Sequence, residues 1–450
     1  MTGSAELERL VRESAREANI LPLTSRCDVR CVFCSHKNNP PEVRTISAGV
    51  RSMEDVARTL PYLDPGRVIT IGESATLIVE GEPLAYPRFK EVISQVRRAF
   101  PGTPLEITTN GRRLTDDMVR LLESLGRVSL NVSLNSVSAR GRELLMGETR
   151  AECGWAVEGV RRLASSSLRF GGSLVAMPHV TGWDDIRDTV AFLATHGAAV
   201  VTVVMPAFSS RATSDVLPEA DLHGRLREFA DSVAAESACP VLIEPSRVMD
   251  LTPVVSGVLR HSPAWGAGVR RGDVFALIEG TRPRCRVEAW NLLSAPGGVH
   301  AEVLRGGRRE RVCWQNAREG DSGITMEYDF DPARVDRLGA TIMGCPDRSA
   351  LLTSALGHAV VQEVLALLGI GPDKAEPVMV ENRTFGGTIG AAGLLTVDDY
   401  REGYVSWSRA GYPPSQIVVP LEGFDARGVD LKGEHFSKLQ ESTGVPVVLL

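Results

Sequence analysis

The stretch Thr24–Lys37, TSRCDVRCVFCSHK, places three cysteines within eight residues, at Cys27, Cys31 and Cys34. Tetrahedral zinc takes four protein ligands and a disulfide joins two cysteines, so neither accounts for three cysteines by itself. The spacing is C-x3-C-x2-C, and the apolar segment NILPLTS at 19–25 leads into it. We expect this segment to form the first strand of a sheet that presents the cysteines on a loop.

The composition limits what this chain can be. Its 450 residues are too many for one ordinary hydrophobic core, so two or three domains are expected. The net charge of −6 suits a cytoplasmic protein and argues against a dedicated nucleic-acid surface. The N-terminus lacks the apolar run of a secretory signal, and no run approaches the ~18 residues of a membrane span. In the cytoplasm, eight cysteines are better explained as thiols or metal ligands than as a disulfide framework.

Strands and helices alternate over the first half of the chain. The segment 88–100 repeats apolar residues at helical spacing, at Phe89, Val92, Ile93, Val96 and Phe100. The next helix is expected within 114–126, with Thr115 as its N-cap and Gly126 as its stop. Such alternation predicts a parallel sheet or barrel whose function lies at the carboxyl ends of its strands. These strands are expected within 68–83, 104–111, 127–135, 171–180 and 198–208.

Two other sequence patterns follow. From about Ser246 short strands and Gly-rich turns prevail, and 297–314 predicts a β-hairpin with a Gly-Gly turn. From about Ala317 α/β alternation returns. We therefore expect an α/β protein with a partial (β/α)6 TIM-type barrel, a small β-rich domain and a C-terminal α/β domain. The expected boundaries are an N-terminal helix at 1–20, the barrel at 21–215, a linker helix and strand at 216–245, the β-rich domain at 246–316 and the C-terminal domain at 317–450.

Three chemistries fit the cysteine motif. A zinc site would recruit His36 as a fourth ligand and crowd all four ligands on one short loop. A redox pair of Cys31 and Cys34 would leave Cys27 without a role. Three thiolates can instead hold three irons of a [4Fe–4S] cluster and leave the fourth iron open for another ligand. The spacing, with Phe33 before the last cysteine, resembles the signature of the radical S-adenosylmethionine (SAM) superfamily, in which SAM fills the open iron.

The resemblance extends to the ends of the later strands. The turn Glu80–Pro83 is similar to the family's Gly-Gly-Glu-Pro turn, which holds the SAM amino group, with Glu80 in place of the first glycine. The motifs TTNG, VSLNS, MPHV and VVMPAF then follow in the family's order. The resemblance therefore implies that Cys27, Cys31 and Cys34 bind the cluster. It also implies that SAM contacts Phe33, Gly81, Glu82, Pro83, Thr109, Asn110, Ser133, Asn135 and Met205.

Two modules of the second half have resemblances of their own. The segment 256–280 resembles a bacterial-type PDZ domain, with an S-P-A turn at Ser262–Ala264. PDZ domains bind extended peptides by strand addition, but we favour a spacer that packs against the barrel, because the sequence does not identify a carboxylate-binding loop. The motif Asn382–Gly387 resembles part of a C-terminal domain of unknown function that accompanies PDZ and radical SAM modules in bacteria.

Some residues of the C-terminal half have open roles. Arg383 beside the Gly386–Gly387 pair either binds an anion at a backbone nest or forms a structural ion pair next to turn glycines. Cys345 is expected at a strand-to-helix junction, where a thiol would be exposed and activated, and it is the candidate catalytic residue. A second cluster on Cys285, Cys313 and Cys345 is disfavoured because their spacing contains no C-x2-C pair.

These resemblances imply a radical SAM oxidoreductase that cleaves SAM reductively and starts radical chemistry on a peptide, a protein or a small metabolite. Flavodoxin or ferredoxin would supply the electron, and the C-terminal modules would close over the substrate. Two alternatives use the same cysteines: an iron–sulfur electron carrier or scaffold, and a variant that transfers an aminocarboxypropyl group. The carrier would not need the Gly-Glu-Pro motif. Membranes and nucleic acids are not expected as partners.

Overall fold

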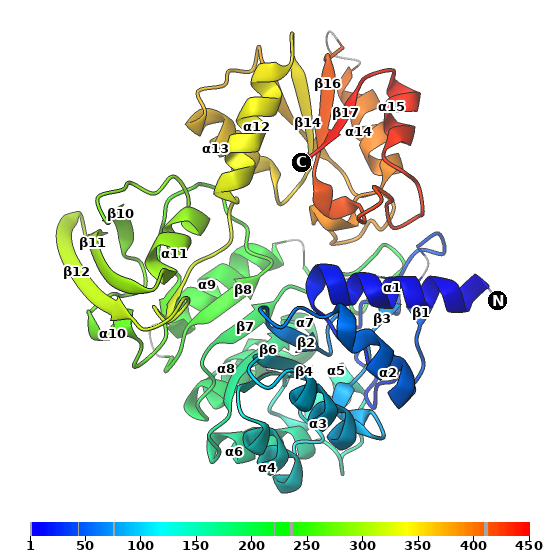
Figure 1. Cartoon of the computed structure of the whole chain (residues 1–450), viewed down its shortest axis with the longest axis vertical. Coiled ribbons are helices and arrows are strands. Elements are labelled where there is room, and N and C mark those ends of the chain that lie inside the picture. Colours follow the sequence, from blue (N-terminus) through cyan, green and yellow to red (C-terminus); the bar gives the residue numbers. More distant parts are fainter. Residues whose placement is uncertain (1, 44, 75–76, 220, 235–236, 409–412) are drawn as a thin grey trace. The chain divides into compact units, whose positions relative to one another are not determined.

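The computed structural model describes residues 2–43, 45–74, 77–219, 221–234, 237–408 and 413–450 (Figure 1). The chain forms two compact units, and neither is one continuous stretch of sequence. Unit 1 consists of Met1–Lys37, Arg44–Pro206 and Thr213–Glu244. Unit 2 consists of Asn38–Val43, Ala207–Ala212 and Pro245–Leu450. Two short segments within the first half of the sequence thus belong to the second unit.

A six-stranded sheet forms the centre of unit 1, and all its neighbouring strands are parallel, in the order β2-β4-β5-β6-β7-β8. This agrees with the expected α/β fold with a parallel sheet. The strands are β2 (Ile69–Ile71), β4 (Leu105–Thr109), β5 (Val128–Ser133), β6 (Arg169–Val175), β7 (Val201–Val204) and β8 (Val241–Glu244). The helices are α1 (Thr2–Ala18), α2 (Met53–Thr59), α3 (Phe89–Ala99), α4 (Asp116–Leu125), α5 (Ala139–Met146), α6 (Trp155–Ala164), α7 (Pro178–Thr181), α8 (Trp183–Thr195) and α9 (Leu222–Ala234).

Local sequence signals account for the ends of several of these helices. Helix α4 begins after Thr115, whose side chain accepts the Met118 N–H, and ends at Gly126 with φ +63°. Both residues were expected at these positions. Helix α3 buries Phe89, Val92, Ile93 and Val96, the apolar face that the sequence predicts. The 3-10 turns η1 (Leu60–Tyr62) and η2 (Pro83–Ala85) complete the loops around the sheet.

One expectation about the sheet was wrong. The segment 19–25 is no regular strand: Ile20 forms only an isolated parallel bridge with Thr70. Pro22 has no N–H to continue the hydrogen bonding, which explains the interruption. The segment 216–245 supplies the helix and the strand expected there, as α9 and β8, and β8 pairs with β7 as an edge strand of the sheet. Next to the sheet, β1 (Ile46–Ser47) pairs with β3 (Ile78–Val79).

The first part of unit 2 is β-rich. Strand β9 (Gly257–Val258) pairs antiparallel with β13 (Ile324–Thr325), and a separate antiparallel sheet has the order β10-β11-β12. The turn between β11 and β12 is Gly306–Gly307, as expected from the sequence, and both glycines have positive φ. The other elements are β10 (Val274–Ile278), β11 (Gly297–Arg305), β12 (Arg308–Asn316), α10 (Pro263–Gly266) and α11 (Arg286–Ser294).

The remainder of unit 2 is a parallel α/β layer. Its four-stranded sheet has the order β15-β14-β16-β17, and every pair is parallel. A shared core joins this layer to the β-rich part, since Cys285 packs with Val335 and Leu338. The elements are α12 (Pro332–Gly344), β14 (Ser349–Ser354), α13 (His358–Leu367), β15 (Ala375–Val380), η3 (Ala392–Leu394), α14 (Val397–Ser408), β16 (Gln416–Val419), η4 (Leu421–Gly423), α15 (Ser437–Thr443) and β17 (Val447–Leu449).

No helix in the described part of the chain combines the length and the apolar character needed to cross a bilayer.

Candidate cofactor site

The three cysteines lie on an irregular loop held together by its own backbone. The Cys34 N–H donates to the Cys31 carbonyl at 3.3 Å, and the Lys37 N–H donates to the Cys34 carbonyl at 3.1 Å. The Lys37 ammonium also caps the carbonyls of Arg30 and Cys31. Cys27 is exposed, Cys31 and Cys34 are half-buried, and all three are free thiols. The loop thus presents three unpaired sulfurs close together in sequence.

Two of these thiols, Cys27 and Cys31, have raised pKa values. Burial raises the pKa of Cys31 to about 12, and the neighbouring Cys27 and Cys34 contribute in the same direction. The pKa of Cys27 is raised too, first by desolvation and then by the nearby carboxylates of Glu82 and Asp28. Because metals bind thiolates, loading this loop with metal must release protons.

The loop is joined to the Glu80–Pro83 turn by backbone hydrogen bonds. The Gly81 N–H donates to the Thr24 carbonyl at 2.8 Å, and the Glu82 N–H donates to the Arg26 carbonyl at 2.9 Å. A Cβ on Gly81 would lie 2.0 Å from the Arg26 carbonyl oxygen. Only glycine therefore lets the turn approach the residues that precede Cys27.

Glu82 lies at the centre of the site. Its Oε1 accepts the Thr109 hydroxyl at 2.6 Å and the Leu84 N–H at 3.1 Å, and its Oε2 accepts the Asn110 N–H at 2.7 Å. Burial raises the pKa of Glu82 to about 7, although all three hydrogen bonds favour its ionised form. A carboxylate has about four acceptor positions, so Glu82 can take one further donor.

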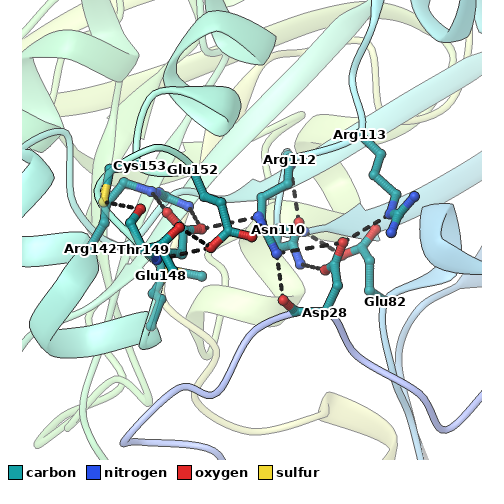
Figure 2. Close-up of polar contacts among 12 residues, drawn as sticks. Asp28, Glu82, Asn110, Arg112, Arg113, Arg142, Glu148, Thr149, Glu152 and Cys153 are labelled. Atoms are coloured by element: carbon teal, nitrogen blue, oxygen red, sulfur yellow. Dashed lines mark hydrogen bonds and ion pairs between the residues drawn. The ribbon is translucent and has the colours of Figure 1, made fainter.

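Asp28 connects this carboxylate to the cysteine loop, as Figure 2 shows. The Asn110 side-chain amide donates to the Asp28 carboxylate at 2.8 Å, and the Arg113 guanidinium donates to the same carboxylate at 2.9 Å. Arg112 donates to the Asp28 carbonyl. Asp28 directly follows Cys27, so the position of the first cysteine depends on the residues at the end of β4.

Behind Asp28 lies a buried ionic network (Figure 2). The Arg112 side chain is 3% exposed and pairs with Glu152 at 2.6 Å and with Glu148 at 3.5 Å. Glu148 in turn pairs with the fully buried Arg142 at 2.6 Å. Sequence reasoning missed Asp28 and this network. The only sequence signal was Arg112 and Arg113 directly after TTNG, and arginines at that place are usually solvent-exposed.

Two other expected SAM contacts, Ser133 and Asn135, already form hydrogen bonds within the protein. Ser133 lies at the end of β5, where its hydroxyl is 3.1 Å from that of Ser173 on β6. Asn135 has φ +63° and its side chain is already committed, accepting the Val175 N–H and donating to the Ser133 carbonyl, both at 3.0 Å. Hydrogen bonds to the local backbone thus explain the positive φ and the side-chain position of Asn135, and no ligand is needed to account for them.

The remaining expected contacts are apolar side chains. Pro83 is buried at the start of η2. Met205 follows β7, donates its N–H to the Glu244 carbonyl at 2.7 Å and packs partly buried on the core of unit 1. Phe33 is half-buried on the cysteine loop. Direct hydrogen bonds thus join Glu82 to Thr109 and Asn110. Pro83, Met205 and Phe33 lie outside this set of hydrogen bonds.

Glu80 stands where the family pattern has glycine. Burial raises the pKa of Glu80 to about 8, with the nearby Arg51 acting in the opposite direction. Its Oε1 is buried and has no hydrogen-bond partner among the described residues. This unpaired buried carboxyl oxygen can take a hydrogen-bond partner that the described residues do not supply.

Cys345 is not where the sequence placed it. It caps the C-terminal end of α12, a helix-to-strand junction rather than a strand-to-helix junction. Its thiol is buried, and its carbonyl accepts the Lys374 ammonium at 2.6 Å. Helix N-termini activate thiols, and this position lacks that influence. The placement therefore gives no support to a catalytic role.

Arg383 is engaged in surface ion pairs. Its guanidinium pairs with Glu381 at 3.0 Å and with Glu402 at 2.6 Å. A cavity of about 210 Å³ lies beside it, lined by residues including Ser354, Asn382 and the Gly386–Gly387 pair. No basic side chain is among the residues that line it. This favours the structural ion pair over an anion site.

In the β-rich part, the outer edge of β13 is already occupied. Thr325 and Gly323 direct their carbonyls toward the β9 side, where they accept N–H groups. The Ile324 carbonyl faces the other way and accepts the Trp290 indole N–H at 3.2 Å. The Ile324 N–H donates to the Ser322 hydroxyl at 3.4 Å. A peptide strand added at this edge would have to displace the indole.

Comparison with known families identifies the site region. Residues 21–193 match the family model described as Radical SAM superfamily. This stretch is a radical SAM domain, and it indicates an enzyme of the radical SAM type. That family uses a [4Fe–4S] cluster together with SAM.

Individual relatives match over shorter stretches. The GTP 3′,8-cyclase of Klebsiella pneumoniae subsp. pneumoniae is 28% identical over 130 residues, which cover 29% of this chain and 37% of that protein. The tungsten-containing aldehyde ferredoxin oxidoreductase cofactor-modifying protein of Pyrococcus furiosus is 33% identical over 107 residues, covering 24% of this chain and 27% of that protein. The chain thus matches well under half the length of these relatives. Among solved structures, Streptococcus suis SuiB bound to the precursor peptide SuiA has a TM-score of 0.40 at 16% identity, covering 50% of this chain and 48% of SuiB.

Proposed function

We propose that the chain is a radical SAM enzyme in which Cys27, Cys31 and Cys34 bind a [4Fe–4S] cluster and Glu82 receives the amino group of SAM. The geometry of Glu82 is the observation that carries this proposal. This carboxylate is buried, retains acceptor capacity and is connected through Asn110 to Asp28, next to the first cysteine. An electron carrier needs no such carboxylate.

The donor set fits the cluster better than it fits a single metal ion. Among the described residues, no group of three His, Cys, Asp or Glu side chains converges to hold one ion. A mononuclear zinc site needs that convergence, whereas each cysteine of an iron–sulfur cluster binds a different iron. Three free thiols on one loop meet this looser requirement.

When bound, the reduced cluster supplies the electron that cleaves SAM and starts radical chemistry. The chain's own residues bind and orient the cofactors. Glu82, as a carboxylate, accepts hydrogen bonds from an ammonium group, and Thr109 and Asn110 hold Glu82 in place. Met205 offers an apolar contact for the adenine, and Ser133 a hydroxyl for the ribose or carboxylate. Flavodoxin or ferredoxin is the proposed electron donor.

We propose that the substrate is a polypeptide or a small metabolite, from which a hydrogen atom is abstracted. The occupied edge of β13 favours the spacer role of residues 246–316 over a peptide grip. The packing of Cys285 against Val335 and Leu338 supports the same conclusion, because it fixes this PDZ-like part to the C-terminal domain at 317–450.

The test is anaerobic. Iron and sulfide are reconstituted, the cluster is reduced with dithionite, SAM is added and 5′-deoxyadenosine is measured by mass spectrometry. We expect product from the parent chain and from the control Cys313→Ala, which removes an exposed cysteine outside the loop. Cys31→Ala should give none.

Other outcomes would favour the alternatives. Methylthioadenosine in place of 5′-deoxyadenosine would indicate aminocarboxypropyl transfer. A reducible cluster that leaves SAM intact would overturn the proposal in favour of an electron carrier.

A further inference from the structure

Two short segments of the first half of the sequence fold with unit 2. They are segment 38–43 and segment 207–212, whose flanking residues on both sides belong to unit 1. Asn38 comes four residues after Cys34, and Ala207 comes two residues after Met205. Both segments therefore leave unit 1 directly beside residues of the proposed cofactor site.

Segment 207–212 is hydrogen-bonded to the turn formed by residues 382–388. The Thr388 N–H donates to the Phe208 carbonyl and the Ser210 N–H donates to the Phe385 carbonyl, both at 2.8 Å. The Phe208 N–H donates to the Thr388 hydroxyl at 2.9 Å. Phe208 and Phe385 are both buried. The contact is thus a short backbone ladder with an apolar centre.

The Gly-Gly pair of the turn is fitted to this segment. A Cβ on Gly387 would lie 2.1 Å from the Phe208 carbonyl oxygen, and a Cβ on Gly386 would lie 3.0 Å from the Ser210 side chain. Both glycines have positive φ, +64° and +63°. Close approach of another stretch of backbone explains the glycines here, without an anion in a nest.

The turn is also held by hydrogen bonds from within its own domain. The buried Asp399 carboxylate accepts the N–H groups of Arg383 and Thr384, both at 2.9 Å, and also that of Thr396. The Asn382 side chain accepts the Phe385 N–H at 2.9 Å. An element held this way can impose its geometry on a less regular partner.

Segment 207–212 in turn holds segment 38–43. The Ser209 hydroxyl donates to the Asn38 carbonyl and accepts the Arg211 N–H at 3.2 Å. A chain of contacts therefore runs from the turn through Ser209 to the residues that follow the cysteine loop.

We propose that the 382–388 turn is an intramolecular positioning site for the cofactor-binding loops. It fixes segments 207–212 and 38–43, and through the chain it restrains Met205 and the cysteine loop for SAM binding. This inference rests on the proposed function and assigns a role to the C-terminal domain.

The test uses full-length variants in matched pairs. Gly387→Ala places a methyl group against Phe208, whereas Gly390→Ala in the same loop meets its neighbours at 3.6 Å or more and is the control. Thr388→Val removes the acceptor for the Phe208 N–H, whereas Thr443→Val removes the acceptor for the Val445 N–H at 3.3 Å, in the same domain but outside the turn, and is the control. Thr388→Val remains informative if Gly387→Ala does not fold.

Hydrogen exchange of the cluster-free chain is the first readout. In Gly387→Ala and Thr388→Val the amides of both segments should exchange about tenfold faster, the effect of losing one ordinary hydrogen bond, with no change in the controls. In the reconstituted chain the same two variants should weaken SAM binding by about fivefold at unchanged iron content, because the binding-competent loop arrangement is less populated.

Unchanged exchange in both variants would overturn the positioning role, and so would faster exchange with unchanged SAM affinity. A parent chain that binds no SAM would instead overturn the proposed function, while the exchange result would still decide whether the turn holds the segments.

Discussion

Glu82 is a carboxyl group under two opposing influences. Burial disfavours its ionised form and raises its pKa to about 7, whereas a bound ammonium group would favour the ionised form. If Glu82 receives the SAM amino group, SAM affinity must change with pH in the neutral range.

The predicted direction follows from the raised pKa. About a tenth of Glu82 is ionised one pH unit below its pKa, so SAM should bind about tenfold more weakly at pH 6 than at pH 8. Glu82→Gln should bind SAM weakly and lose this pH dependence. Equilibrium dialysis of the reconstituted chain measures both. The control is Glu106→Gln, which removes another carboxyl of raised pKa on β4.

The Glu82 carboxyl also makes folding stability depend on pH. Its contribution to stability falls as the pH rises, whereas SAM affinity should increase. A raised pKa in the folded state favours folding below the unfolded value near 4.5, and this contribution is lost as the pH rises toward 7. The cluster-free parent should therefore lose more stability than Glu82→Gln between pH 5 and pH 8 in thermal melts. Parallel pH profiles would contradict the burial of this group.

Gly81 should tolerate no side chain. Its missing Cβ would lie 2.0 Å from the Arg26 carbonyl oxygen, so Gly81→Ala must push the turn away from the cysteine loop. We expect a loss of about 2–4 kcal/mol in unfolding free energy, by analogy with overpacked sites, and a lower iron content. Gly102→Ala, where nothing lies within 4 Å, is the control. Denaturant unfolding and iron analysis test the prediction, which fails if both variants behave alike.

At this scale the sequence predicts ligand types better than it predicts their surroundings. The cysteines, Glu82, Thr109 and Asn110 could be named from motif spacing, and the structure connects the last three by direct hydrogen bonds. Asp28 could not be named in this way, because the sequence does not show that the side-chain amide of Asn110, 82 residues away, would bind it.

The loop between α5 and α6 is tied to the cysteine loop by Arg112. This arginine contacts the Asp28 carbonyl and pairs with Glu148 and Glu152. Removing one partner of a buried pair leaves an uncompensated charge, which costs more than the pair itself contributes.

Arg112 and Arg113 offer a matched comparison, since both contact Asp28 and they differ in burial. The Arg113 side chain is half exposed and that of Arg112 is almost fully buried. Arg112→Gln should cost about 3–5 kcal/mol of stability and Arg113→Gln less than about 1 kcal/mol. Urea unfolding measures both values. Equal losses would mean that the network does not depend on burial.

Elements with strong local signals could be predicted from the sequence. Helix α4 has its cap and its stop, and the β11–β12 hairpin has its Gly-Gly turn. The first strand was predicted wrongly because one proline interrupts its hydrogen bonding. The strand within 216–245 was expected, but its pairing with β7 was not, because that pairing is a tertiary contact that periodicity does not reveal.

Across the whole molecule the cysteines fall into accessible and protected groups. Cys27 and Cys313 are exposed, whereas Cys153, Cys285 and Cys345 are buried. Burial also raises the pKa of Cys285 to about 11. Cys285 is therefore protected in two ways: reagents cannot easily reach the buried thiol, and its raised pKa leaves little of the reactive thiolate.

Iodoacetamide labelling of the cluster-free chain should follow this division. We expect Cys313 to be alkylated about a hundredfold faster than Cys285 at pH 7.5, with the rates read by peptide mass spectrometry. Adding denaturant should remove the difference. Similar rates in the native chain would show that unit 2 opens readily.

The interleaving of the two units also orders events during synthesis. The ribosome completes the residues of unit 1, up to Glu244, before it makes residues 382–388. Until then, segments 38–43 and 207–212 have no turn to bind, and the cysteine loop emerges next to unpaired backbone. Folding from the N-terminus therefore leaves the cysteine loop without this restraint until residues 382–388 have been translated.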